Sequence, residues 1–289
     1  MQIVTDSGTN VQLTPEESAR LNVHIIPLQV TINGKTYREG IDLDAAHFYP
    51  MLEASPDMPL TSQPPVGEFV KLYEELSKGD EEILSIHMSS GLSGTYNAAM
   101  TAASMVRGAC ITVVDTLMLG APAGWQVEAA AKAAAAGWSK DRILELMARI
   151  RSATEVFFTL KELKYLIHGG RISHLKGLIG SLLNIKPLIG VEKEHGTYVQ
   201  QGQSMSFSGA IKSASELISR RFAPGTKLRM QVVHADNLTD ALTLKDEISR
   251  RFNGEWLPVS VLSLVLGAHV GASMIGVAAA PEDLFAILP

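Results

Sequence analysis

The turn at residues 89–95 brings hydroxyl side chains and glycines together at the expected start of a helix. A short buried strand is expected over 82–88 and a helix over 95–106, so the segment between them is a strand-to-helix turn. The hydroxyls of Ser93 and Thr95, together with N–H groups from Gly94 onward, could hold an anion there. The turn contains no Lys or Arg, which favours a single carboxylate over a polyphosphate. The alternative is that Ser93 or Thr95 only caps the helix.

A second pair of hydroxyls, Thr61 and Ser62, lies in a proline-rich stretch that is expected to be a loop over 55–65. Pro64 suits the first turn of a helix whose apolar stripe runs from Phe69 to Leu76. Thr61 and Ser62 would therefore stand at the entrance of a helix, as Ser93 does. Helix capping is again the alternative role.

A cation and a titratable ring complete the set of candidate site residues. Arg171 follows a double glycine, which predicts a tight turn just before the next helix; an exposed surface arginine is the alternative. His269 lies between two glycines that are expected to break an apolar region over 259–280. A histidine in an apolar run is usually a core residue, and that is its alternative reading.

Ser93 and His269 also fit a different class of function, a serine hydrolase of acyl esters with Ser93 as nucleophile and His269 as base. The nucleophile-elbow pattern Gly-x-Ser-x-Gly is nearly present over 91–95, but Thr95 occupies the place of the last glycine. No acidic residue between the two stands out as a third member. Metal chemistry is not indicated, because the eight histidines form no His-x-x-x-His pair and cysteines do not cluster.

Composition and length bound the class of protein. The chain has 289 residues, which suggests two domains, and 46% of them are apolar. Only 19% are charged, without a basic run, and the net charge is −5, which argues against nucleic acids and anionic membranes as partners. Cys110 is the one cysteine, so a reducing cytoplasm is expected. Neither a signal peptide nor an apolar run long enough to cross a membrane is recognisable, and no stable membrane insertion is expected.

The pattern of elements explains how the candidate residues could meet. Over residues 1–152 strands expected at 2–5, 24–31, 82–88 and 111–115 alternate with helices, including two over 122–136 and 140–151. This predicts a three-layer α/β domain with a parallel sheet, in which ligands collect at the carboxyl ends of strands, where the turns at Ser7, Thr61 and Ser93 would lie. Over 153–289 the pattern changes to a mixed α/β domain, with strands at 155–159, 183–189 and 228–234 and helices at 161–167, 207–222 and 238–252.

Six short motifs, in order along nearly the whole chain, together resemble the DegV family of fatty-acid-binding proteins. They are Val4-Thr5-Asp6-Ser7, Thr61-Ser62-Gln63-Pro64, Ser90-Gly91-Leu92-Ser93-Gly94-Thr95, Gly169-Gly170-Arg171-Ile172-Ser173, Leu183-Asn184-Ile185-Lys186-Pro187 and Gly267-Ala268-His269-Val270-Gly271. The resemblance implies two α/β domains with one fatty acid buried in a tunnel between them. It also implies that Thr61 and Ser93 hold the carboxylate, helped by the backbone near Gly94, with His269 and Arg171 near the head group or the face where a kinase docks.

The same resemblance implies a bacterial carrier rather than an enzyme, similar to the substrate-carrying subunit of bacterial fatty acid kinase. A separate ATP-dependent kinase would then form the acyl phosphate, and this chain would need no cofactor beyond its bound fatty acid. Two departures from the family pattern occur, at Gly271-Ala272-Ser273 and at Ser7-Gly8-Thr9-Asn10. A more remote likeness to the substrate half of dihydroxyacetone kinases leaves a small ketone attached to a histidine as a third interpretation.

Overall fold

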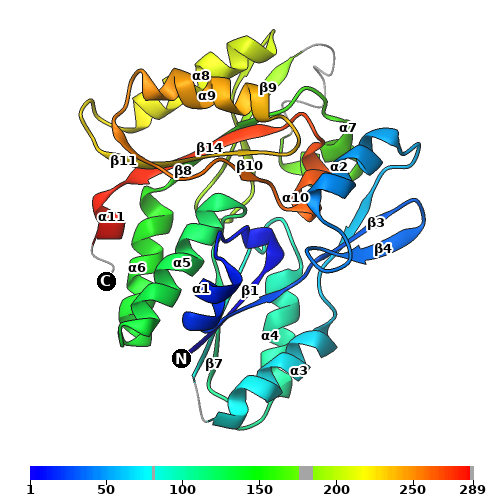
Figure 1. Ribbon diagram of the computed structural model, residues 1–289, viewed down its shortest axis with the longest axis vertical. Helices are drawn as coiled ribbons and strands as arrows, with labels where there is room; N and C mark the ends of the chain where they lie inside the picture. Colours follow the sequence, from blue (N-terminus) through cyan, green and yellow to red (C-terminus); the bar gives the residue numbers. More distant parts are fainter. Residues whose placement is uncertain (80–81, 176–184, 287–289) are drawn as a thin grey trace.

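The computed structural model describes residues 1–79, 82–175 and 185–286, and the strands in these ranges form three sheets. The first is a four-stranded parallel sheet in the order β2 (Val23–Ile26), β1 (Gln2–Asp6), β6 (Ile83–His87) and β7 (Ile111–Asp115). Helices α3 (Val66–Leu76) and α4 (Thr95–Met105) cover one face, and α5 (Ala121–Ala135) covers the other (Figure 1). This is the predicted three-layer α/β arrangement with a parallel sheet.

The second sheet is mixed and belongs to the C-terminal part of the chain. Its seven strands are β8 (Glu155–Thr159), β9 (Lys186–Val191), β10 (Tyr198–Ser204), β11 (Leu228–His234), β12 (Gly254–Trp256), β13 (Ser260–Val261) and β14 (Ile275–Pro281). Strand β14 runs antiparallel between β11 and β8. Helices α8 (Phe207–Arg221) and α9 (Leu238–Ser249) cover one face, at the top of Figure 1. The prediction of a mixed α/β arrangement is therefore confirmed.

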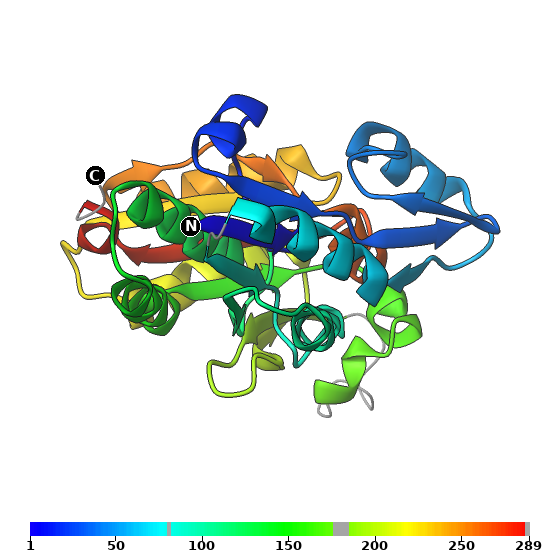
Figure 2. The same ribbon diagram turned by 90° about the horizontal axis from the view of Figure 1, so that it is seen from below.

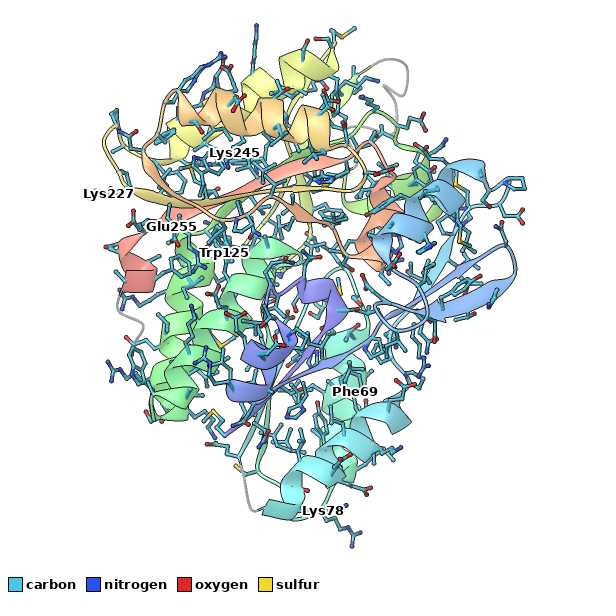
Figure 3. All side chains as sticks on the ribbon, viewed as in Figure 1. Phe69, Lys78, Trp125, Lys227, Lys245 and Glu255 are labelled. Atoms are coloured by element: carbon cyan, nitrogen blue, oxygen red, sulfur yellow. The ribbon has the colours of Figure 1, made fainter. Side chains whose placement is uncertain are left out.

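The other face of the mixed sheet packs on the N-terminal part through α5 and α6 (Lys140–Ala153). Trp125 of α5 lies at this contact (Figure 3) and its indole N–H donates a 3.0 Å hydrogen bond to the amide oxygen of Gln231. One turn further along α5, Glu128 forms a 2.8 Å ion pair with Arg229. One continuous apolar core therefore joins the two sheets, while the domain boundary after residue 152 stays a prediction.

The third sheet is small and was not predicted as a unit. It consists of β4 (Lys35–Arg38), β3 (Gln29–Ile32) and β5 (Leu60–Ser62), all antiparallel. Figure 2 shows the β3–β4 hairpin projecting beyond the parallel sheet with α2 (Ala45–Ala54) beside it. Asn33 and Gly34 form the turn between β3 and β4, with φ of 51° and 72°.

Three sequence predictions are corrected here. The strand expected over 24–31 is two strands in different sheets, because Pro27 and Leu28 separate β2 from β3. The loop over 55–65 contains β5, so Thr61 and Ser62 lie on a strand rather than at a helix entrance. The apolar region near the C-terminus does not break at 267–271, since helix α10 (Leu264–Val270) includes Gly267 and His269 and ends at Gly271, where φ is 77°.

The remaining elements are short. They are α1 (Pro15–Arg20), α7 (Lys164–His168), α11 (Asp283–Ala286) and 3-10 turns over Ser7–Thr9, Ser77–Gly79 and Arg171–His174. The helix expected over 161–167 is α7, which begins later, and residues 183–184 of the expected strand lie outside the described ranges. Among the described residues, none of the helices has both the length and the apolar character that crossing a bilayer requires.

Candidate functional site

Thr61, Ser93, Gly94, Arg171 and His269, although far apart in sequence, line one cavity of about 60 Å³. We call it the polar cavity. It lies between β5, the turn before α4, the 3-10 turn at residue 171 and α10. Its remaining lining residues are Leu28, Ser62, Gln63, Met88, Leu92, Leu119, Tyr198, Val265 and Leu266.

The Nε2 atom of His269 lies 2.7 Å from Oγ1 of Thr61. The other ring nitrogen, Nδ1, is buried and has no hydrogen-bond partner among the described residues. A buried N–H without an acceptor is rarer and more costly than an unfilled lone pair, so we assign the proton to Nε2. His269 then donates to Thr61, and the Thr61 hydroxyl hydrogen is free to point into the cavity.

The His269 ring is held tightly and stays neutral. Burial is the main cause that lowers the pKa of His269 from 6.5 to about 4, and the positive charge of Arg171 is the second cause. Nδ1 faces the backbone of Gly169, where a Cβ atom would stand only 2.0 Å from it. Only a residue without a side chain therefore fits beside this imidazole.

Ser93 and Thr95 form a hydroxyl pair at the amino end of α4. Their oxygens lie 2.8 Å apart, and the Thr95 N–H donates to Ser93 Oγ at 3.3 Å. Gly94 is the N-cap and supplies no side-chain cap, so the positive end of the 11-residue helix faces this region. Ser93 lines the polar cavity, whereas Thr95 is fully buried behind it and does not.

Strand β5 packs directly against this turn. The side chain of Gln63, just after β5, reaches Gly94: a Cβ atom there would lie 2.3 Å from Oε1 of Gln63. Because Thr61 pairs with Val30 and Ser62 with Gln29, the side chains of Thr61 and Ser62 point to opposite faces of β5. Ser62 is exposed and donates to Gln29 at 3.3 Å, so only Thr61 directs its hydroxyl toward His269.

Arg171 supplies the positive charge at the mouth of the cavity. Its Nε donates to the Leu92 carbonyl at 3.1 Å, and its Nη1 donates to the Gly169 carbonyl at 2.6 Å. None of the ion pairs among the described residues neutralises it. The guanidinium also lines an open groove formed by residues 90–94 and 169–171, which we call the outer groove.

An apolar cavity of about 50 Å³ lies behind the polar cavity and shares Leu119, Tyr198 and Leu266 with it. Its walls come from β8, β11, β14, α10 and the start of α5. The lining residues beyond those shared are Gly120, Ala121, Pro122, Val156, Phe158, Val191, Val233, Leu262, Val270, Met274, Gly276, Val277 and Ala278. A polar head and a long apolar tail could thus be bound side by side.

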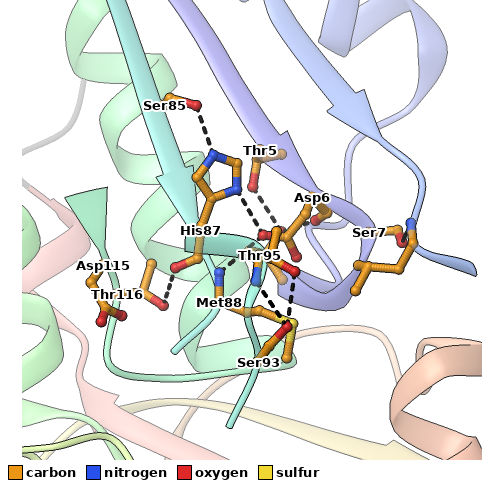
Figure 4. Close-up of polar contacts among 12 residues, drawn as sticks. Thr5, Asp6, Ser7, Ser85, His87, Met88, Ser93, Thr95, Asp115 and Thr116 are labelled. Atoms are coloured by element: carbon orange, nitrogen blue, oxygen red, sulfur yellow. Dashed lines mark hydrogen bonds and ion pairs between the residues drawn. The ribbon is translucent and has the colours of Figure 1, made fainter. Parts of the chain in front are cut away.

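A chain of buried polar side chains leads up to the strand end from which the turn begins (Figure 4). Asp6 Oδ2 accepts the Met88 N–H at 3.0 Å and lies 2.9 Å from His87 Nδ1, while His87 Nε2 lies 2.7 Å from Ser85 Oγ. Ser85 in turn lies 2.7 Å from the hydroxyl of Tyr73. The order Asp-His-Ser matches a hydrolase triad, but Asp6, His87 and Ser85 are all fully buried in the parallel sheet. The chain therefore ties β1 to β6 at the point where the turn begins.

The serine-hydrolase interpretation finds no support in the geometry around Ser93. Its hydroxyl pairs with Thr95, and the imidazole of His269 pairs with Thr61 instead. A nucleophile needs a hydrogen bond to its base, and this pair does not form one.

Sequence reasoning missed Glu39, which anchors the helix that carries His269. The carboxylate accepts hydrogen bonds from Ser7 Oγ at 2.6 Å, from Ser263 Oγ at 2.9 Å and from the Leu264 N–H at the start of α10. Burial raises the pKa of Glu39, and these three hydrogen bonds act in the opposite direction. Nothing in the Arg38-Glu39-Gly40 stretch signalled this role, because the partners of Glu39 on α10 lie more than 220 residues away.

Comparisons of the sequence and of the structure with known proteins lead to the same family. The sequence profile described as "Uncharacterised protein, DegV family" matches residues 1–282. A DegV domain-containing protein of Halalkalibacterium halodurans is 34% identical over 95% of this chain and 96% of its own length, and protein DegV of Bacillus subtilis is 32% identical over 95% and 97%.

Two solved structures superpose on the chain with a TM-score of 0.86, each covering 97% of this chain and 99% of the other. One is a DegV family protein of Thermus thermophilus described for its fatty acid binding, at 28% identity. The other is DegV of Bacillus subtilis, described as a fatty acid binding protein, at 32% identity.

Proposed function

The chain belongs to the DegV family, and we propose that it binds a long-chain fatty acid, with the carboxylate in the polar cavity and the acyl chain in the apolar cavity. The observation that carries the proposal is that the two cavities are neighbours and share Leu119, Tyr198 and Leu266 in their walls. Hydroxyls and a cation surround one end, and side chains without polar groups surround nearly all of the other. The fatty-acid-binding descriptions of the two superposed structures agree with this assignment.

The proposed carboxylate ligands are Thr61 and Ser93, assisted by the backbone at Gly94 and by Arg171. Each hydrogen bond to a charged group contributes roughly 1.5–3 kcal/mol, so several such donors can offset the cost of burying a carboxylate. His269 acts through Thr61, because donation from Nε2 turns the threonine hydroxyl toward the ligand. Thr95 holds the Ser93 hydroxyl, and Ser62 remains outside the proposed contacts.

The acyl chain supplies most of the proposed affinity. Burying one methylene contributes about 0.8 kcal/mol, so a chain of a dozen or more carbons outweighs the contribution of the head group. The hydroxyls then fix orientation, and the carboxylate faces the outer groove.

We further propose that the protein is a carrier and not an enzyme, and that a separate ATP-dependent kinase phosphorylates the carboxylate through the outer groove. Residues 90–94 and 169–171 leave an open space of about 380 Å³ beside Arg171, wide enough for a phosphoryl group to approach. The kinase would hold ATP and its metal, and this chain would need no cofactor. A cytoplasmic location fits a partner that uses ATP and fits the exposed, unpaired Cys110.

The direct test is mass spectrometry of small molecules released from gently purified and then denatured protein. A stoichiometric fatty acid is expected, because a buried acyl chain dissociates slowly. Protein that is empty and also fails to bind added hexadecanoic acid would refute the proposal. Addition of a bacterial fatty acid kinase and ATP to the loaded protein then tests the carrier role, with acyl phosphate as the expected product.

A further inference from the structure

Tyr198, the first residue of β10, is the polar residue among the three that line both cavities. Its side chain lines both cavities, and the residue is only 5% exposed. The ring packs edge-to-face on Phe158 with 5.3 Å between the ring centres. Among the hydrogen bonds formed by the described residues, none involves the Tyr198 hydroxyl.

The two ends of this side chain face different surroundings. Phe158, its ring partner, belongs to the wall of the apolar cavity. The hydroxyl is close enough to Arg171, in the polar cavity, for the guanidinium charge to oppose the rise that burial causes in the pKa of the phenol. Tyr198 therefore borders the proposed head-group site and the proposed tail site at once.

A plain acyl chain leaves this hydroxyl without a partner. The first methylenes after the carboxylate would pass Tyr198, and methylenes neither donate nor accept hydrogen bonds. A buried hydroxyl without a partner costs free energy, whereas phenylalanine would supply the same ring packing without that cost. The carboxylate ligands proposed above are Thr61 and Ser93, and Tyr198 is not among them. The presence of a tyrosine at this position is therefore explained by a ligand that carries an oxygen atom just beyond its carboxylate.

We propose that the site prefers fatty acids with a hydroxyl group on the second or third carbon, and that the Tyr198 hydroxyl forms a hydrogen bond with that group. The inference rests on the proposed function, since it specifies which class of fatty acid the same two cavities take. Tyr198 is here a specificity residue, and Thr61 and Ser93 keep the carboxylate.

The experiment compares Tyr198→Phe with the native protein by displacement of a fluorescent fatty acid. The competitors are hexadecanoic, 2-hydroxyhexadecanoic and 3-hydroxyhexadecanoic acid. For at least one hydroxy acid, the substitution is expected to weaken binding roughly three- to tenfold, the effect of one hydrogen bond, while hexadecanoic acid binds equally well or better. Tyr37→Phe, on the β3–β4 hairpin outside both cavities, serves as the control and should change none of the three affinities.

Each other outcome overturns the inference. If the substitution weakens the binding of all three acids equally, Tyr198 contacts the carboxylate or stabilises the fold. If the affinities do not change, its hydroxyl contacts no group of the ligand. Suppose that the native protein binds hexadecanoic acid, but that the ratio of the affinities for hydroxy acids and hexadecanoic acid is the same in Tyr198→Phe. Then only this inference fails. If the native protein binds none of the acids, the proposed function fails with it.

Discussion

His269 and Thr61 contact each other through a 2.7 Å hydrogen bond across 208 residues of sequence. This bond joins α10 to the edge strand β5, and it decides which way the threonine hydroxyl points. The hydroxyl hydrogen is available to a ligand while Nε2 carries a proton and donates to Thr61. The site therefore depends on the protonation of a residue that need not touch the ligand.

The carboxylate donors are tested by the double substitution Thr61→Val and Ser93→Ala. Two hydrogen bonds to a charged group are lost while the packing volume at residue 61 is kept, so the affinity for hexadecanoic acid should fall at least about a hundredfold. Thr36→Val is the control, because Thr36 is exposed on β4 and lines neither cavity. Fluorescent fatty acid binding measures both, and undiminished binding in the double variant would remove these residues from the site.

The stability of the protein should depend on pH through His269. The pKa of this residue is about 4 in the folded protein and 6.5 in the unfolded chain, so between these values the unfolded chain binds more protons. The contribution of the neutral ring to the free energy of unfolding is complete above pH 6.5. It decreases as the pH falls toward 4 and is lost below pH 4. The difference in pKa limits the loss to about 3 kcal/mol.

Urea unfolding at pH 7, 5.5 and 4.5 measures this dependence. His269→Gln keeps a donor toward Thr61 but cannot titrate, so its stability should fall less than that of the native protein over the same range. Identical slopes in the two proteins would show that His269 is not the titrating group.

The apolar cavity should determine the length of the bound chain. Ala278 of β14 lines this cavity and is 1% exposed, so Ala278→Val places two methyl groups in the path of the tail. The preferred acyl chain should shorten by about two carbons, each worth about 0.8 kcal/mol. Ala214→Val, on the buried face of α8, overpacks a region away from the cavity. It should lower the stability of the protein without changing the length of the bound acyl chain. Mass spectrometry of bound acids reads out the difference, and an unchanged length distribution would contradict the tail assignment.

Glu39 should position the site without touching the ligand. Glu39→Ala leaves the hydroxyls of Ser7 and Ser263 and the Leu264 N–H without their acceptor, and the free energy of unfolding should fall by about 3 kcal/mol. Because α10 is no longer fixed at its start, fatty acid affinity should fall as well. Glu53→Ala, on the exposed side of α2, should leave the free energy of unfolding within about 0.5 kcal/mol of native. A variant at residue 39 with native stability would contradict the anchoring role.

The regular alternation of strands and helices could be read from the sequence because it depends on local patterns. The strands at 2–5, 82–88 and 111–115 and the helices at 95–106, 122–136 and 140–151 match the structure closely. The family was also recognisable, since its motifs are short and contiguous, and the whole-chain profile match confirms it.

Features that depend on distant partners could not be read in the same way. Thr61 is on a strand because β3 pairs with it, and His269 is on a helix despite its glycines because Glu39 and Tyr49 hold α10 from outside. The sequence analysis did not single out Tyr198, and only its place in the walls of two cavities drew attention to its hydroxyl. The roles of the candidate site residues stay predictions until binding is measured.

The contact between Gly169 and the His269 ring has a genetic consequence. Every missense change reachable from a glycine codon by one base introduces a Cβ atom, and here that atom would lie 2.0 Å from a buried ring nitrogen. Even alanine would push the imidazole away from Thr61. A library of random single-base variants selected for fatty acid uptake should therefore return position 169 almost unvaried, whereas its neighbour Gly170, with open space around it, is constrained only by its φ of 74°.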